Sequence, residues 1–366
     1  KRQGPDGSFL PSGTFRCPDG PAGTFAGNIL NFSTPDGTPG VANCGPPPME
    51  GCGDPYTPIS IIQGNGLASP LDGIEVSTEG VVVGDFQDGK GGFFIQDAAG
   101  DADMTTSDGI FVFSTSVDVD VGYVVRVRGS VDEYFGLTEI NGVSQIWLCS
   151  TGHSVAPTPL SLPVTSLDDF EAYEGMLVTL PQALYVSEYF NFDRYGEIVL
   201  TTERQFQPTA THEPGSVEAA QLALANSLGR ITLDDGRDSQ NPDPAVHPNG
   251  LEFTLDNLFR GGDSVQNVTG VLDYDFGLYK VQPTQGADYT STNPRAALPD
   301  DVGGDVRVAA FNVLNYFTTL DDGVNDICGP SMDQECRGAD TPEEFTRQRD
   351  KIVAALAAMN ADVVGL

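Results

Sequence analysis

The sequence predicts a mainly β protein that ends in the first strand, helix and strand of an α/β domain. Two observations support this prediction. Between residues 59 and 289, short runs of β-branched and aromatic residues alternate with Gly and Asp turns, as they do in small barrels or sandwiches. From residue 305, a mostly apolar strand, a helix at 341–360 and a second apolar strand follow in the order found in α/β sheets.

Before residue 290, the sequence divides into a lead-in and two β-rich modules. Residues 1–58 are rich in Gly and Pro and lack periodicity, so we expect an extended, disulfide-bearing lead-in. The modules are expected at 59–158 and 159–289, the latter with an insertion at about 203–250. A polar linker at 290–304 then leads to the final segment, 305–366. Strands are predicted at 75–83, 92–96, 109–113, 123–129, 137–148, 174–180, 195–200, 270–274 and 277–281.

The two modules share similar sequence segments. EGMLVTL at 174–180 parallels EGVVVGDF at 79–86, and VTGVLDYDFGLYKV at 268–281 parallels VRGSVDEYFGLTEI at 127–140. The second match preserves Val-x-Gly, an acidic and aromatic turn, and Phe-Gly-Leu. We interpret it as an approximate repeat of one barrel type. The alternative is a generic similarity between hairpins.

The final segment has clear signals for a helix between two strands. Thr341 is a suitable N-cap, and Glu344 completes a capping box. The strands at 305–314 and 362–366 are apolar enough to be buried on both faces. Because one helix and two strands cannot bury such surfaces alone, we expect a fragment of a larger α/β sandwich, or a unit that packs on another component.

The composition is strongly acidic. There are 52 acidic and 18 basic residues, for a net charge of −34 at pH 7. A chain with this charge repels phosphate backbones on average, so any action on nucleic acid requires a metal ion or a local patch. Two interpretations of the acidity stay open, and they are compatible: a solvated surface suited to salty water or secretion, and loops that hold calcium or magnesium.

Other features concern membrane insertion, processing and assembly of the chain. No stretch approaches the roughly 20 consecutive apolar residues of a membrane span. The sequence begins at Lys1 without a start methionine or signal peptide, so we interpret it as a processed or excised segment. The sequence does not determine whether the chain self-assembles.

The cysteines indicate disulfides in an oxidising, extracellular compartment. Their number is even and none forms a C-x-x-C pair, which argues against a zinc ribbon. Cys328 and Cys336 flank a short polar loop and are the predicted pair. The connectivity of the remaining cysteines stays open; they are Cys17, Cys44, Cys52 and Cys149.

One loop of the first module is a candidate calcium site. It gathers four carboxylates between two predicted strands: Asp97, Asp101, Asp103 and Asp108. Calcium favours such oxygen-rich loops, although the spacing is not that of an EF-hand. The alternative is a solvated acidic turn.

The first module also contains aromatic residues and a few cations. If the rings were exposed, bases of single-stranded nucleic acid could stack on them, with weak, salt-sensitive contacts from Lys90, Arg126 and Arg128. The alternative is that the rings form a core and the module is a structural spacer. The rings are Phe93, Phe94, Phe111, Phe113, Tyr123, Tyr134 and Phe135.

Asn312 is a polar residue near the end of an otherwise apolar strand, and alone it would indicate only a turn. Its context is more specific. RVAAFNVLNYF, CGPSMDQECRGAD, EEFTRQRDKIVAALAAMN and ADVVGL follow in that order. Together they resemble the opening of the endonuclease/exonuclease/phosphatase superfamily, the DNase-like four-layer sandwich. GGFFIQDAAGDADMTTSDGIFVF and VDVDVGYVVRVRGSVDEYFGLTEI resemble the OB-like module that precedes the catalytic domain in secreted bacterial nucleases of this superfamily.

The resemblance spans about residues 75–366 and implies a secreted hydrolase that cleaves phosphodiester bonds of DNA or RNA with Mg²⁺ or Mn²⁺. It implies that Asn312 positions the metal and phosphate, and that a metal-ligating glutamate falls just after Leu366. Arg337, Asp340 and Gln348 are candidate rim residues, with salt bridging between the disulfide loop and the helix as the alternative. Because one asparagine supplies neither a ligand set nor a general base, this segment alone is expected to be inactive.

Two other functions stay open. The chain could be a secreted, calcium-stabilised β-module protein that serves adhesion or extracellular assembly. It could also be a phosphatase of the same superfamily that acts on small or lipid phosphates.

Overall fold

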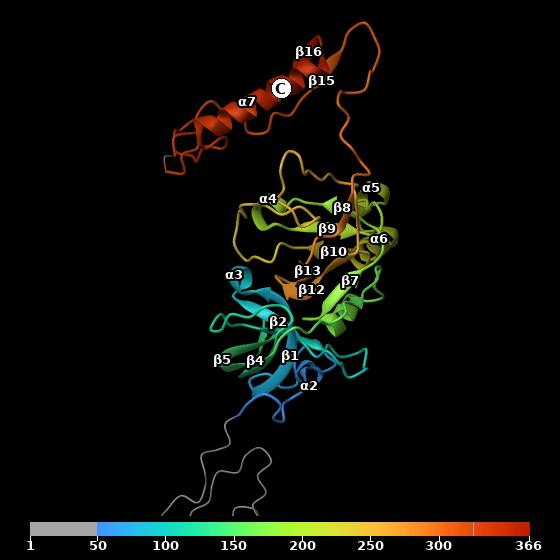
Figure 1. The fold of residues 1–366 in the computed structure, drawn as a ribbon. Helices are drawn as coiled ribbons and strands as arrows, with labels where there is room; N and C mark the ends of the chain where they lie inside the picture. The colour runs from blue at the N-terminus through green and yellow to red at the C-terminus, as the bar shows by residue number, and fades with distance from the viewer. Residues whose placement is uncertain (1–49, 325) are drawn as a thin grey trace, which may run out of the picture. The chain divides into compact units, whose positions relative to one another are not determined.

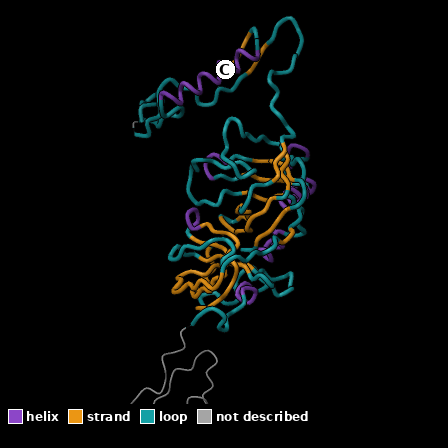
Figure 2. The backbone as a smooth tube through the Cα atoms, viewed as in Figure 1, coloured by secondary structure: helices purple, strands orange, loops and turns teal. Residues whose placement is uncertain are grey.

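The computed structural model describes residues 50–324 and 326–366. These residues form two compact units that divide between Thr292 and Asn293. Strands outnumber helices in the first unit, and the second contains the longest helix of the described residues (Figures 1 and 2). The expectation of a mainly β chain with OB-like modules, followed by strand, helix and strand, is confirmed.

The first module is a closed five-stranded barrel with the strand order β1-β2-β3-β5-β4. Neighbouring strands are antiparallel, except that β3 and β5 run parallel. This is the connectivity of an OB-like barrel. Inward-facing Phe93, Ile95 and Ile110 help fill its core. Its elements are α2 (Ile59–Gln63), β1 (Glu75–Phe86), α3 (Gln87–Lys90), β2 (Gly92–Gln96), β3 (Gly109–Val112), β4 (Val124–Tyr134) and β5 (Leu137–Ser150).

The second module is a nine-stranded sheet in the order β14-β11-β8-β9-β10-β13-β12-β7-β6. Its elements are β6 (Thr158–Pro159), the 3-10 helix η1 (Leu167–Tyr173), β7 (Leu177–Leu180), β8 (Leu184–Glu188), α4 (Phe192–Tyr195), β9 (Ile198–Thr201), α5 (Pro208–Thr211), α6 (Val217–Leu228), β10 (Arg230–Leu233), β11 (Ser264–Gln266), β12 (Val268–Asp275), β13 (Leu278–Pro283) and β14 (Asp288–Thr290).

The second module repeats the strand pairing of the first. β7 pairs with β12 and β8 with β9, so these two short strands together occupy the place of β1. β9, β10, β12 and β13 then correspond to β2, β3, β4 and β5, including the parallel pair β10–β13. Pro181, between β7 and β8, cannot donate a ladder hydrogen bond, which is consistent with the break in the strand.

The two matched hairpins end in the same tight turn. Tyr134 pairs with Leu137 in one hairpin, and Asp275 pairs with Leu278 in the other. Both central residues of each turn have positive φ: 53° and 97° at Phe135 and Gly136, and 50° and 79° at Phe276 and Gly277. Positive φ at both central positions is the mark of a type I′ turn, and it leaves each Phe side chain pointing into solvent. The two rings are 85% and 86% exposed.

The insertion contains a helix that the sequence analysis did not predict. α6 begins after Ser216, whose Oγ accepts a hydrogen bond from Ala219 N at 3.1 Å. Ser216 is thus an N-cap before an Ala- and Leu-rich run of high helix propensity. Of the α6 residues only Ala219 is buried, so the helix lacks the strong apolar stripe by which such elements are usually found.

The two modules, called the two barrels below because they share their strand pairing, pack through close backbone contacts. A Cβ atom on Gly109 of β3 would lie 2.2 Å from the carbonyl carbon of Gly175, just before β7. Side chains join the barrels nearby, because Glu174 Oε1 accepts from Thr138 N and Gln96 Oε1 accepts from Leu177 N, each at 2.9 Å. An apolar cluster completes the interface; it consists of Val83, Phe94, Phe111, Leu137 and Val271.

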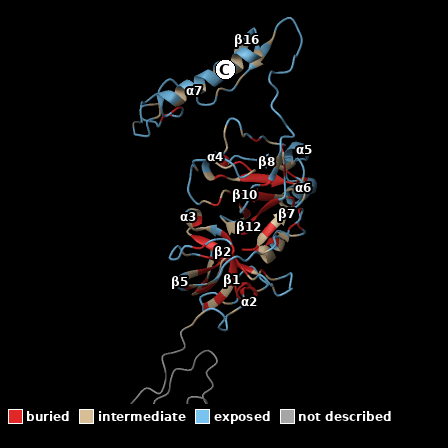
Figure 3. Cartoon of the chain, viewed as in Figure 1, coloured by how far each residue is buried: buried red, intermediate tan, exposed pale blue. Residues whose placement is uncertain are grey.

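The second unit is a parallel strand pair with one connecting helix: β15 (Val308–Ala310), α7 (Pro342–Met359) and β16 (Val363–Gly365). Thr341 caps α7 by accepting from Glu344 N at 3.2 Å. The described residues do not bury these strands, as expected for a helix and two strands alone: Val308 is 71% and Val363 is 55% exposed, and no residue of α7 is buried (Figure 3). Among the described residues of this unit, no second layer covers the strands.

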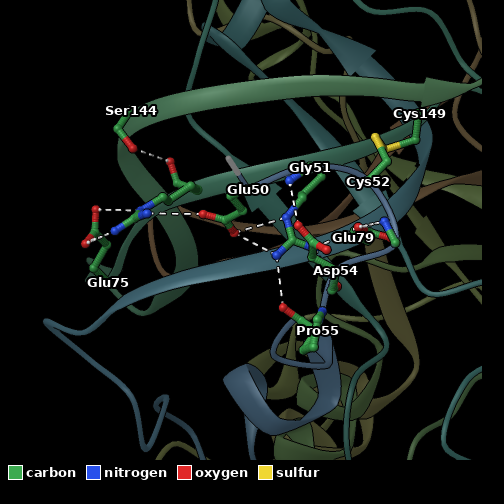
Figure 4. Close-up of polar contacts among 12 residues, drawn as sticks. Glu50, Gly51, Cys52, Asp54, Pro55, Glu75, Glu79, Ser144 and Cys149 are labelled. Carbon is green, nitrogen blue, oxygen red and sulfur yellow. Dashed lines mark hydrogen bonds and ion pairs between the residues drawn. A yellow bond between two sulfur atoms is a disulfide. The ribbon is translucent and has the colours of Figure 1, made fainter. Parts of the chain in front are cut away.

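Two disulfides lie in the described part of the chain. The predicted Cys328–Cys336 bond is confirmed. Cys52 pairs with Cys149, which ties the segment before α2 to the end of β5 (Figure 4). Cys17 and Cys44 lie outside the described residues. Within the described residues, no helix is both long enough and apolar enough to cross a membrane.

Candidate functional site

Asn312 lies in the turn that follows β15. Its Oδ1 accepts a hydrogen bond from Leu314 N at 2.9 Å, and Leu314 and Asn315 both have positive φ. Just before it, Phe311 N donates to the carbonyl of Gly365 in β16 at 2.9 Å. Asn312 therefore lies at the carboxyl end of a parallel strand pair, the edge at which open α/β sheets place their functional residues.

Helix α7 supports this turn with one polar and one aromatic contact. Gln348 Nε2 donates to the carbonyl of Leu314 at 3.1 Å. Tyr316 stacks on Phe345 with ring centroids 5.3 Å apart. The Oε1 atom of Gln348 is buried and has no hydrogen-bond partner among the described residues. The structure thus brings one of the predicted rim residues to the turn of Asn312 and leaves an unused acceptor beside it.

The other two predicted rim residues are exposed. Arg337 follows Cys336 of the disulfide loop, and Asp340 lies just before the N-cap of α7. The backbone N of Asp340 donates to Glu344 Oε2 at 2.9 Å, so this part of the loop is tied to the first turn of α7. That contact fits the structural alternative, in which the loop and the helix are joined.

The described residues do not form a magnesium site at Asn312. A neutral amide supplies one oxygen ligand, whereas magnesium requires several oxygens in octahedral geometry. Among the described residues no three or more His, Cys, Asp or Glu side chains gather closely enough to hold a metal ion. His153, His212 and His247 all belong to the first unit; His247 is buried there against Tyr289 and Phe259.

The candidate calcium loop uses its carboxylates to hold its own backbone. Asp97 Oδ1 accepts from Ala99 N at 2.9 Å, and Asp101 Oδ1 accepts from Asp103 N at 2.8 Å. Asp108 Oδ1 accepts from Asp101 N at 3.3 Å. Burial and the charge of Asp101 raise the pKa of Asp108. These contacts account for the acidic residues as turn-forming groups, and calcium binding stays a prediction.

Arg126 is placed inside the first module and not on its surface. Its side chain is 1% exposed and forms ion pairs with Glu50 at 2.7 Å and Glu79 at 2.8 Å (Figure 4). Its guanidinium also donates to the carbonyls of Asp54 and Pro55. The expectation that Arg126 contacts nucleic acid is therefore corrected, because its donors are engaged and covered.

The other two cations also lie in ion pairs. Lys90 is buried, with Nζ 2.7 Å from Asp238, 3.3 Å from Asp273 and 3.4 Å from Asp275, so its ammonium group is already engaged by carboxylates. Arg128 is 43% exposed and binds Glu75 at 2.9 Å (Figure 4). Of the three predicted contacts, only Arg128 remains accessible.

The predicted aromatic platform is divided between core and surface. Phe93, Phe94 and Phe111 are buried, as the structural alternative expects. Phe113 and Tyr134, by contrast, are exposed, as is Phe135 in its turn. The exposed rings line a cleft between the two barrels, and Phe276 from the matching turn of the second module lines the same cleft.

This cleft has a volume of about 730 Å³. That volume falls within the range of small-molecule sites. One cation, Lys90, contributes to its wall together with five carboxyl groups: Asp132, Glu139, Asp238, Asp273 and Asp275. Sequence reasoning missed this site because its residues come from two modules. The sequence feature that could have indicated the cleft is the Phe-Gly turn shared by the two matched segments.

Glu139 is a cleft carboxyl in a strongly perturbed environment. Burial, assisted by the charges of Asp132 and Asp273, raises its pKa to about 7. Asp132 is its direct cross-strand partner in the β4–β5 ladder. The site thus holds a proton near neutral pH because ionised Glu139 would add a desolvated negative charge to others nearby.

We expect Glu139→Gln to stabilise the first unit at pH 8 by roughly 1–3 kcal/mol and to have little effect near pH 5. The raised folded-state pKa means that the folded protein keeps a proton that the unfolded chain releases. The contribution of Glu139 to wild-type stability should therefore fall as pH rises from about 4.5 to about 7. Urea unfolding at both pH values measures this, with Glu213→Gln, at an exposed carboxyl, as control. Equal effects of Glu139→Gln at both pH values would contradict it.

Comparisons with known proteins give few matches. A family model described as "Domain of unknown function (DUF8508)" matches residues 150–294, the region of the second module. No curated protein matches the chain. Among solved structures, the hypothetical protein ygiW from E. coli is similar over 21% of this chain and 77% of its own, with 24% sequence identity and a TM-score of 0.17.

Proposed function

We propose that this chain is part of an extracellular, metal-dependent nuclease that hydrolyses phosphodiester bonds. In this proposal the two barrel modules are accessory parts, and the unit from Asn293 begins the catalytic domain. The observation that carries it is the position of Asn312, in the turn at the carboxyl end of the parallel pair β15–β16, with α7 as the crossover helix. The disulfides support an oxidising setting, and thereby secretion.

The exposed surfaces of the second unit support a larger domain. Parallel strands occur in proteins almost only with both faces covered. Here Val308 and Val363 are exposed, and so is Val353 on α7. We propose that further strands and a second layer cover these residues in the complete catalytic domain.

The role proposed for Asn312 is positioning. Its amide would help hold the metal ion and the scissile phosphate, and the turn directs the side chain through the Leu314 contact. Magnesium or manganese would supply charge neutralisation at the scissile phosphate. The remaining ligands and the general base are proposed to come from residues beyond those described.

The test uses the product of the complete open reading frame that encodes this chain. We expect Mg²⁺-dependent degradation of plasmid DNA, and a roughly 10²–10³-fold lower kcat for Asn312→Ala, as when one preorganised polar group is lost. Thr319→Ala, at an exposed position in the same region, serves as control. The 366-residue chain alone should not cleave. Absence of cleavage by the complete product would contradict the proposed nuclease activity. Cleavage by the 366-residue chain alone would contradict the proposal that the remaining ligands and the general base come from other residues.

A further inference from the structure

We infer that the cleft between the two barrels binds an organic polycation, of which a linear polyamine is the simplest form. Its methylene segments would lie on the exposed Phe rings and its ammonium groups would face the cleft carboxylates. The inference concerns a site apart from Asn312 and does not rest on the nuclease proposal.

The charge of the cleft excludes phosphate ligands. Five carboxyl groups line it against one lining ammonium group, Lys90, and a second ammonium group, Lys280, lies 3.8 Å from Asp275. Lys90 lies within 3.4 Å of Asp238, Asp273 and Asp275, so it is already engaged. A nucleic-acid backbone would bring more negative charge into a field that is negative already. A cation is therefore the complementary partner.

One buried oxygen in the cleft lacks a partner. Asp273 of β12 is fully buried, and its Oδ2 lies 3.3 Å from Lys90 Nζ and accepts a hydrogen bond from Gln282 at 3.0 Å. Its Oδ1 has no hydrogen-bond partner among the described residues. An unpaired buried acceptor carries a free-energy cost that a donor on a bound ligand would remove. A residue that lines the cleft thus carries an unfilled acceptor, besides the overall charge of the cleft.

The exposed Phe rings of the cleft favour an organic cation over a hydrated metal ion. Phe135 and Phe276 occupy type I′ turns at positive φ, where a bulky residue is disfavoured, and neither ring is needed by a core. Phe113 is exposed in the same cleft. Aromatic faces attract cations and also cover methylene groups. A hydrated metal ion would use none of these surfaces.

The spacing of the carboxylates favours several charges on one ligand. Asp132 and Glu139 come from β4 and β5 of the first barrel, whereas Asp273 and Asp275 come from β12 of the second. Within the described residues they do not gather tightly enough to hold a single metal ion. Ammonium groups separated by short methylene chains suit carboxylates arranged in this way.

The turns keep the cleft in a defined shape. Gly136 lies against Tyr274, since a Cβ there would be 2.8 Å from the ring of that residue. Tyr134 packs edge-to-face on Phe135 with centroids 4.8 Å apart. Lys280 lies 5.5 Å from the centroid of Phe276 on the second barrel. One turn is therefore packed against the opposite barrel, and a ligand finds the walls largely preformed.

The experiment is calorimetric titration of the chain with spermidine at pH 8 and about 0.15 M salt, where weak surface attraction is screened. We expect saturable 1:1 binding. The double variant Phe135→Asn with Phe276→Asn should bind at least about tenfold more weakly, because both rings are lost. Asn tolerates positive φ, so the turns are retained. Net charge is unchanged, so this variant separates the site from diffuse attraction to an acidic chain.

Phe190→Asn is the matched control, since Phe190 is also 85% exposed on the second module but does not line the cleft. It should bind like the wild type. Equal thermal midpoints of all variants would show that the fold is intact. The inference would be overturned by the absence of a saturable heat signal, or by a double variant whose affinity for spermidine is within twofold of the wild-type affinity. It would also be overturned if a lysine-containing peptide bound more tightly and displaced spermidine, because the occupant would then be a protein segment.

Discussion

Replacing Gly109 by alanine is expected to disrupt the packing of the two barrels and to lower the free energy of unfolding by about 3 kcal/mol or more, the upper part of the range for overpacking. The new Cβ would lie 2.2 Å from the carbonyl carbon and oxygen of Gly175 and 2.5 Å from Met176 N. All three atoms are backbone, so no side-chain rotation relieves the overlap. The barrels must move apart.

That movement would also break polar contacts across the interface. The hydrogen bonds from Thr138 N to Glu174 and from Leu177 N to Gln96 join the same surfaces. Urea unfolding followed by circular dichroism and by the fluorescence of Trp147, the single tryptophan, measures the loss. Gly66→Ala is the control, because a Cβ there meets nothing within 4 Å and no positive φ is involved. A stability of Gly109→Ala within about 1 kcal/mol of wild type would refute the prediction.

Local patterns predicted the strands of the first barrel well. The strand at 92–96 has the predicted bounds, and the hairpins with Phe135 and Phe276 turn where their shared Phe-Gly pair indicated. Thr341 and the Cys328–Cys336 pair were found for the same reason. In each case residues close in sequence determine the geometry.

Long-range pairing could not be predicted in this way. The contact of Lys90 with Asp273 joins different modules, and the partner of Arg126 at Glu50 lies in a segment without periodicity. Nothing near these residues in sequence indicates that the positive charges are neutralised. The cleft was missed for the same reason, because its walls belong to two barrels whose packing depends on bare backbone at Gly109 and Gly175.

The second unit shows a different limit of sequence reasoning. The apolar run at 305–314 predicted a long buried strand, but only Val308–Ala310 forms one and it is exposed. Hydrophobicity indicates the environment that a strand needs, and it does not show whether the described residues provide that environment. The turn at Asn312, which depends on local hydrogen bonding, has formed nonetheless.

Arg126→Met should destabilise the first barrel by about 3–5 kcal/mol, the usual loss when one partner of a buried ion pair is removed. Methionine fills much of the same space, but Glu50 and Glu79 would then face each other without their shared cation. The carbonyls of Asp54 and Pro55 would also lose their donors. Trp147, which pairs with Arg126 across the β4–β5 ladder, gives a local fluorescence signal for urea unfolding.

Arg128→Met is the matched control on the same strand. Its ion pairs with Glu75 and Glu50 are partly exposed, and such pairs contribute about 0–1 kcal/mol. Adding Glu79→Gln to Arg126→Met should recover part of the loss, because it removes one of the two uncompensated charges. If Arg126→Met and Arg128→Met lowered the free energy of unfolding by the same small amount, the ion pairs of Arg126 would not be what holds residues 50–55 on the barrel. That joint would then depend on the Cys52–Cys149 bond, which fastens the same segment to the end of β5.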